Sequence, residues 1–425
     1  MGGKLFHPPS PCQNDEMNLR RLLFLVLTVL LALSATAADR RRAFKPASWP
    51  DITIGGLFSL TGDGSTLGIA SQAALELAAH DINAEFQTLH LPYRVTTVIL
   101  DTKLTPAIAA TQLPELVSRG ANFVIGPQSS SEAAAIREYA NANNVILISQ
   151  GSTAGSLALP GDNLFRLAPN DNLEGQAMAA LMRADGIDTL LPMYRNDVGN
   201  TGLYTSTKKW FESMGGTTLP PVSYSPATTD FTQAVNAFGS ELVEYKTAHP
   251  TAKIGVYLAS FEEAVAIFNR ARLDLDLTAL RWYGGDGVTQ SQAVLADANA
   301  AQFAKTTSFT APNVGLDESN KDVWQPISDE IRDRVGFAAD AYSLSVYDAA
   351  WVAALSTVEA QFRSDALREA FVRNVQRYWG ATGLTALDVN GDRKVGNFDF
   401  WTVRDVSGTL QWTRTAQFVS GRLVR

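Results

Sequence analysis

The sequence predicts an α/β protein built on two parallel β-sheets, and three observations point to this class. Short runs rich in β-branched residues alternate with alanine-rich segments of helical periodicity, which is typical of βαβ units and parallel sheets. Hydrophobic residues make up 46% of the chain and charged residues 18%, which is a globular composition. The chain has 425 residues, enough for two or three domains, so a single sheet would not use its length.

The first 37 residues are predicted to be a leader that ends in a cleaved secretory signal peptide. Arg20 and Arg21 precede an apolar stretch over residues 22–38, and the small residues Ala35-Thr36-Ala37 form a typical cleavage site. An uncleaved membrane anchor is the alternative, but an apolar stretch of this length barely spans a bilayer. We therefore expect an exported protein that is periplasmic or extracellular.

The true start codon stays open between Met1 and Met17, because Met17 lies just before the basic pair. The single cysteine, Cys12, falls in the leader, so the exported chain would carry none. That excludes a disulfide framework, a cysteine-based zinc site and an iron–sulfur cluster. The exported chain would keep 32 basic and 41 acidic residues, a net charge of −9, which argues against nucleic-acid binding.

Strands and helices are expected to alternate after a tether over residues 38–49. The strand candidates are residues 52–60, 93–101, 123–126, 145–149, 190–194, 253–259 and 281–283. The helix candidates are residues 69–86, 105–118, 131–143, 173–184, 201–214, 231–248 and 261–273. In the first helix, apolar residues recur at three- and four-residue spacing from Ala70 to Ile82, which predicts one buried face.

Four loops that follow predicted strands have unusual chemistry. They are residues 60–68, 126–132, 149–155 and 283–287. In open α/β sheets, ligands bind outside the carboxyl ends of the strands, where loop backbone and helix N-termini meet. The serine run 129–131 and the Gly151-Ser152-Thr153 segment each precede a helix, so N-capping is an alternative role for them. Together their hydroxyls and N–H groups are suited to holding a carboxylate.

A dinucleotide-binding loop was the first enzymatic alternative. Gly62, Gly64 and Gly68 follow a strand and open a helix, but their spacing is G-x-G-x-x-x-G. The next acidic strand end, Asp101, lies 39 residues past Gly62 instead of about 20. An exported dehydrogenase is kept as a hypothesis, but no cofactor is expected.

Histidine usage also argues against an enzyme. A serine nucleophile needs a histidine base, and the exported chain has only His80, His90 and His249. None of them falls in a loop that follows a predicted strand. We therefore expect neither hydrolase chemistry nor a histidine-rich metal site.

Two further acidic features each allow two interpretations. Residues 388–394 begin D-V-N-G-D and resemble a calcium loop, but the glycine stands at position four instead of six. A hairpin turn at Asn390-Gly391 is favoured instead, and no metal is expected. Asp286, between two glycines, is either a turn residue or the counter-charge of a ligand cation. Phe261, after a strand end, either packs in the core or faces a ligand.

Several motifs resemble those of the branched-chain amino-acid-binding proteins, which are type I periplasmic solute-binding components of ABC importers. The run I-T-I-G-G-L-F-S-L-T-G over residues 52–62, followed by a helix that ends D-I-N-A, resembles the start of these proteins. The resemblance continues through V-I-G-P at 124–127, the serine run, Phe165-Arg166 and Tyr347-Asp348-Ala349. It covers essentially the whole chain after the leader.

The resemblance implies two Rossmann-like lobes with parallel sheets, joined by a three-stranded hinge, which close on a ligand. The crossovers are expected near residues 169–171, 310–312 and 380–383. Lobe 1 would then comprise residues 50–170 and 312–381, and lobe 2 residues 171–311 and 382–425.

The resemblance also implies a ligand site, carried over position by position. In the first lobe, the hydroxyl of Ser130 would hold a ligand carboxylate, assisted by the backbone of Gly151 and by the hydroxyl and N–H of Thr153. Leu67 would bound the pocket for the ligand side chain.

Across the cleft, three second-lobe residues complete this implied site. Phe261 takes an aromatic position, and Asp286 is the implied partner of an ammonium group. Asn200 stands where relatives often have an aromatic residue, and Asp286 is one methylene shorter than the glutamate that amino-acid binders often carry. Both departures favour a ligand larger or more polar than leucine.

The sequence thus predicts a monomeric receptor that captures an amino acid or a related small polar solute and delivers it to an ABC permease complex. A ligand-sensing domain for amino acids, amides or urea that signals to a partner protein is the alternative. The first hypothesis predicts no catalytic residue, no cofactor and no nucleic-acid partner.

Overall fold

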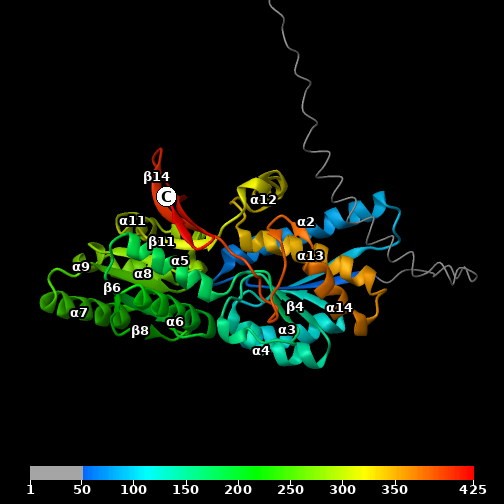
Figure 1. The fold of residues 1–425 in the computed structure, drawn as a ribbon, viewed down its shortest axis with the longest axis horizontal. Coiled ribbons are helices and arrows are strands. Elements are labelled where there is room, and N and C mark those ends of the chain that lie inside the picture. The colour runs from blue at the N-terminus through cyan, green and yellow to red at the C-terminus, as the bar shows by residue number, and fades with distance from the viewer. Residues whose placement is uncertain (1–50) are drawn as a thin grey trace, which may run out of the picture.

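The computed structural model describes residues 51–425, which fold into two α/β lobes lying side by side (Figure 1). The predicted leader, signal peptide and tether lie outside the described residues. Over residues 51–425, no helix combines the length and the apolar character needed to cross a bilayer.

The first lobe is built on a five-stranded parallel sheet in the order β2-β1-β3-β4-β5. Its strands are β1 (Ile52–Phe58), β2 (Val95–Asp101), β3 (Phe123–Ile125), β4 (Ile146–Ser149) and β5 (Leu164–Arg166). The strands β1, β3, β4 and β5 are almost entirely buried, as expected when helices cover both faces of a parallel sheet.

Alternate residues of these strands face two separate cores. Ile125 and Ile148 pack with one helix layer, whereas Val124 and Leu147 pack with the other. The first layer contains α2 (Ser65–Thr88), α12 (Lys321–Val335), α13 (Ala341–Glu359) and α14 (Ser364–Val375). The second layer contains α3 (Pro106–Ser118) and α4 (Ser130–Ala142).

The second lobe has a nine-stranded sheet that is parallel at one side and antiparallel at the other. Its parallel strands are β6 (Thr189–Arg195), β7 (Thr217–Thr218), β8 (Val222–Tyr224), β9 (Ile254–Ala259), β10 (Arg281–Gly284) and β11 (Thr310–Val314). The antiparallel strands β14 (Phe398–Val406), β15 (Thr409–Val419) and β16 (Arg422–Val424) extend the edge at β11. A two-stranded ribbon of β12 (Trp379–Gly380) and β13 (Gly383–Leu384) stands apart from both sheets.

Helices cover both faces of the second sheet. The helices α5 (Asp171–Ala184) and α6 (Val198–Ser213) pack on one face. The helices α7 (Thr232–Ala248), α8 (Ala264–Ala271) and α11 (Ala298–Thr306) pack on the other. Short helices α9 (Leu275–Thr278) and α10 (Gln292–Ala296) lie in the connections.

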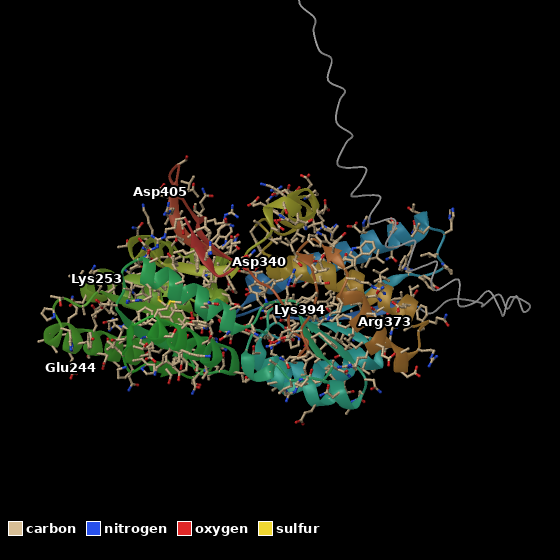
Figure 2. All side chains as sticks on the ribbon, in the orientation of Figure 1. Glu244, Lys253, Asp340, Arg373, Lys394 and Asp405 are labelled. Atoms are coloured by element: carbon tan, nitrogen blue, oxygen red, sulfur yellow. The ribbon has the colours of Figure 1, made fainter. Side chains whose placement is uncertain are left out.

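The predicted α/β class with parallel sheets is confirmed, but the crossovers differ from the expected ones. The strand β11 pairs with β10 and β14 as far as Val314, so the chain leaves the second lobe after residue 314 and not near 312. Leu387 packs in the first lobe's core and Asp392 bridges to β5, so residues 382–393 belong with the first lobe. Figure 2 shows Lys394 on that lobe, before the chain turns into β14.

The predicted turn at Asn390-Gly391 is present, but it does not join two long paired strands. Gly391 has a φ of +80°, and the N–H of Asp388 donates to the carbonyl oxygen of Asp392 at 2.7 Å. The acids of the calcium-like motif bind protein groups: Asp388 accepts from two backbone N–H groups, and Asp392 accepts from Arg166 at 2.6 Å. Within residues 51–425, no three His, Cys, Asp or Glu side chains are grouped to hold a metal ion.

Candidate functional site

A cavity between the two lobes brings all seven predicted site residues together. The volume of the cavity is about 70 Å³. The first lobe contributes Leu67, Ser130, Gly151 and Thr153, and the second lobe contributes Asn200, Phe261 and Asp286. Because the two lobes supply opposite walls, any change in their relative position changes the cavity.

The N-terminus of α4 forms one end of the cavity. Ser129 is its N-cap and forms a capping box with Glu132, so the capping role falls to this serine. Ser130, at the first helical position, is 3% exposed and lines the cavity. Its hydroxyl accepts from the N–H of Ala154 at 3.2 Å and lies 3.1 Å from the hydroxyl of Ser152. A helix N-terminus with serine hydroxyls favours a negatively charged ligand group.

The loop after β4 approaches the cavity closely at Gly151. A Cβ atom at this position would lie 2.9 Å from the carbonyl oxygen of Gln128, so a side chain would displace the neighbouring loop. Gln128 in turn joins two first-lobe loops, because its amide donates to the carbonyl oxygen of Gly64 at 2.9 Å and accepts from the N–H of Ser59 at 3.2 Å. The backbone around Gly151 is therefore held in place at the cavity wall.

Thr153 joins the cavity to the first crossover. Its carbonyl oxygen accepts from the N–H of Asp171 at 2.9 Å, and Asp171 begins α5. Burial raises the pKa of the Asp171 carboxyl to about 7, although the neighbouring Thr153 hydroxyl offsets part of the shift. The Asp171 carboxyl therefore does not line the cavity, but Asp171 is bonded to Thr153, which does.

Asp286 follows β10 in a short 3₁₀ turn over Asp286–Val288 and carries the acidic end of the cavity. Its Oδ2 accepts from the phenol hydroxyl of Tyr342, in α13 of the other lobe, at 2.6 Å. Its own N–H donates to Oε1 of Glu174 at 3.1 Å. Burial raises the pKa of the Asp286 carboxyl.

Asn200 and Phe261 are fixed by polar partners outside the cavity. The N–H and the side-chain amide nitrogen of Asn200 both donate to Asp197, so the amide oxygen is what remains to accept from a ligand. The guanidinium of Arg195 stacks on the Phe261 ring at 5.4 Å while pairing with Asp197 at 2.9 Å. Arg195 does not line the cavity.

Among the described residues that line the cavity, the charged side chains are all carboxylates. Glu262, Asp286 and Asp340 line it, and no lysine, arginine or histidine among the described residues does. Figure 2 shows Asp340 where the lobes meet. Asp340 accepts from the N–H of Ser343 at 2.7 Å and caps α13. The charged residues of the cavity lining are therefore all acidic.

Glu262 joins the lobes across the cleft. Its Oε2 accepts from the N–H of Ser65 at 3.0 Å, at the start of α2, and its Oε1 accepts from the hydroxyl of Thr66 at 2.5 Å. Ser291 of its own lobe donates to Oε1 at 2.7 Å. A second cross-lobe contact pairs Arg195 with Asp63 at 3.2 Å. The structure therefore shows the two lobes in direct contact.

Sequence reasoning missed several residues of the cavity wall. Glu262 is adjacent to the predicted Phe261, so the same strand-end argument could have found it. Asp340 and Tyr342 lie at the N-terminus of α13, for which no helix was predicted. The N-cap pattern of an aspartate followed by an alanine-rich run could have indicated that helix start.

Known proteins resemble this chain over most of its length. A family model described as periplasmic binding protein matches residues 51–407. An uncharacterized protein of Methanocaldococcus jannaschii is 27% identical over 83% of this chain and 87% of its own length. The Leu/Ile/Val-binding protein BraC3 of Rhizobium johnstonii is 24% identical over 59% of this chain and 65% of its own. The chemotactic signal transduction system substrate-binding protein BasB of Halobacterium salinarum is 25% identical over 78% and 75%.

Solved structures share the fold. The leucine-binding protein LivK of Thermotoga maritima superposes with a TM-score of 0.71 and 17% identity, over 88% of this chain and 98% of its own. LivJ of Streptococcus pneumoniae in complex with isoleucine has a TM-score of 0.69 and 20% identity, over 86% of this chain and 100% of its own. A solute-binding protein of R. palustris in complex with benzoate has a TM-score of 0.69 and 17% identity, over 86% of this chain and 96% of its own.

BraC3, BasB and the fold neighbours are solute-binding proteins and not enzymes, which agrees with the sequence prediction. Because the family model matches most of the chain, the protein belongs to the periplasmic binding protein family. It is a type I member related to the Leu/Ile/Val-binding proteins.

Proposed function

We propose that this solute-binding receptor captures an amino acid, or a related small solute that carries an ammonium group, and delivers it to an ABC importer. The observation that supports this proposal is the polarity of the cavity. Its lining includes the α4 N-terminus with the Ser130 hydroxyl from the first lobe and the Asp286 carboxyl from the second. A zwitterion matches both groups at once, because a carboxylate suits the first and an ammonium group suits the second.

In this proposal the seven predicted residues all face the solute. Ser130, Gly151 and Thr153 hold its carboxylate, and Asp286 with the amide oxygen of Asn200 holds its ammonium group. Leu67 and Phe261 bound its side chain. The receptor acts outside the cytoplasm as a monomer and needs no cofactor.

A thermal-shift panel of the 20 amino acids, short amides, urea and benzoate tests this proposal. A solute that binds only the folded protein stabilises it by about 2.7 kcal/mol at a concentration one hundred times its Kd. We expect a subset of the amino acids to raise the Tm, and benzoate and urea to leave it unchanged. If benzoate shifts the Tm and no amino acid does, the zwitterion assignment is wrong.

A sensing role is the second candidate function. It is favoured by the similarity to BasB, whose name describes a substrate-binding protein of a chemotactic signal transduction system. Both roles use the same cavity, so ligand binding does not separate them. Co-purification of the ligand-loaded receptor with membranes that contain a candidate permease or a candidate signalling receptor separates them, because only one of the two membranes is expected to retain it.

A further inference from the structure

A second carboxyl lies directly behind Asp286, outside the cavity lining. Glu174, in α5, is 1% exposed, and its Oε1 accepts from the N–H of Asp286 at 3.1 Å. This bond holds the Glu174 carboxyl beside Asp286, and the side chains of the two residues interact. Asp286 faces the ligand cavity on one side and Glu174 on the other.

The contact between these two carboxyls lacks a hydrogen-bond donor when both are ionised. Oδ2 of Asp286 receives the phenol proton of Tyr342, but Oε2 of Glu174 is buried and receives none. A buried acceptor without a donor is costly, and so is a pair of carboxylates in contact. A single proton between the two groups removes both costs.

Among the described residues, no lysine, arginine or histidine lines the cavity beside this pair. Burial raises the pKa of Glu174 well above its ordinary value, and the negative charges of Asp286 and Asp171 add to the shift. The titratable groups that interact with the pair are Asp171 in α5, Tyr257 in β9, and Asp340 and Tyr342 at the start of α13. None of these four groups is a cation. Arg166 in β5 interacts with Asp171, and Asp392 engages it through two bonds of 2.6 Å.

We propose that Glu174 and Asp286 share one proton in the folded protein, so that the pair presents a single negative charge to the cavity. Glu174 then acts as a positioning residue, because the shared proton fixes the Asp286 oxygen that faces it. The second Asp286 oxygen is fixed by Tyr342, so the carboxyl has a hydrogen bond on each side.

This proton sharing has a consequence for ligand choice that rests on the proposed function. A pair with one negative charge matches one ammonium group, so the shared proton sets the charge that this pair offers to the ligand. The proton sharing itself does not depend on the ligand, so it is tested in the ligand-free protein. Failure of the thermal-shift panel and failure of this test are therefore distinguishable.

The test compares the pH dependence of unfolding in the wild type and in Glu174→Gln. A carboxyl whose pKa is raised by folding takes up a proton in the folded state, so stability falls as pH rises from its ordinary pKa of 4.5 toward the raised value. Glutamine mimics the protonated side chain and keeps a donor toward Asp286. We expect E174Q to unfold at the same temperature as the wild type near pH 5 and at a higher temperature at pH 8.

Infrared spectroscopy gives the second readout. At pH 8 the wild type minus E174Q difference spectrum should contain the carbonyl band of a protonated carboxylic acid. Glu212→Gln, an exposed glutamate of α6 in the same lobe, is the matched control, for which neither effect is expected. The proposal is overturned if E174Q keeps the wild-type pH slope, if it is less stable than the wild type at pH 8, or if the acid band is missing from the difference spectrum.

Discussion

At the scale of single residues, the groups that can bind a ligand are the donors and acceptors that no neighbouring protein group engages. Ser129 takes the capping bonds of α4, which leaves the Ser130 hydroxyl facing the cavity. Asp197 takes the N–H donors of Asn200, which leaves that residue's amide oxygen. The sequence predicts that these residues follow strand ends, but it does not predict which neighbouring side chain accepts from which donor.

The charge of Asp286 is tested by Asp286→Asn. Asparagine keeps the shape and the bond from Tyr342 but removes the charge that we propose for an ammonium partner. Loss of such a charge-assisted bond is expected to cost about 1.5–3 kcal/mol of binding free energy for an amino acid that shifts the Tm of the wild type. Isothermal titration calorimetry measures it.

Asp405→Asn is the control for this variant, since Asp405 is an exposed aspartate of the second lobe that pairs with Lys305 at 3.3 Å. An uncharged amide that binds the wild type should lose little affinity in either variant. Equal amino-acid affinity in D286N and D405N would refute the role of Asp286.

At the scale of elements, helix α2 connects ligand binding to closure. The first turn of a helix carries N–H groups without helical acceptors, and Glu262 of the opposite lobe accepts from one of them, that of Ser65. The strands and helices predicted before residue 283 are present, because each had a clear periodicity. The helix α13 escaped prediction because it is buried on nearly all sides and so lacks a polar face.

Glu262→Gln should weaken ligand binding by destabilising the closed state. Glutamine keeps the size of the side chain but removes the negative charge at the α2 N-terminus, an effect of about 0.3–2 kcal/mol. A ligand that contacts both lobes binds the closed state most tightly, so a less stable closed state should raise the Kd. The rise should come mainly from faster dissociation. Stopped-flow fluorescence measures the dissociation rate.

Glu76→Gln on the exposed face of α2 is the matched control, and it should leave the dissociation rate unchanged. Thermal unfolding of ligand-free E262Q measures any general loss of stability, since Glu262 also accepts from Ser291 of its own lobe. An unchanged dissociation rate in E262Q would show that this contact does not hold the lobes together.

At the scale of the whole molecule, the chain passes between the lobes at three places, and one of them is clamped to the first lobe. The buried Arg166–Asp392 pair joins residues 226 positions apart, and both side chains are 1% exposed. Arg393 adds a bond to the carbonyl oxygen of Leu167 at 3.2 Å. The sequence alone indicated a turn near residue 390, but not that its acid would pair with an arginine of β5, since such long-range pairing has no local pattern.

Asp392→Asn should destabilise the whole protein. Removing one partner of a buried ion pair leaves the other charge uncompensated, which costs about 3–5 kcal/mol. Urea unfolding followed by circular dichroism measures the loss. Asp329→Asn, which breaks the exposed pair with Arg332 in α12, is the comparison and should change the midpoint far less. Similar midpoints for the two variants would contradict the clamp.

The path of the chain places its two described ends on different lobes. Ile52 opens β1 of the first lobe, whereas Arg425 contacts Asp185 beyond the end of α5 in the second. Residues 51–425 contain no cysteine, so a single cysteine introduced near each end would accept a fluorescent dye without background labelling. Energy transfer between the dyes would then report the separation of the lobes, and the receptor would serve as an optical sensor of its own solute.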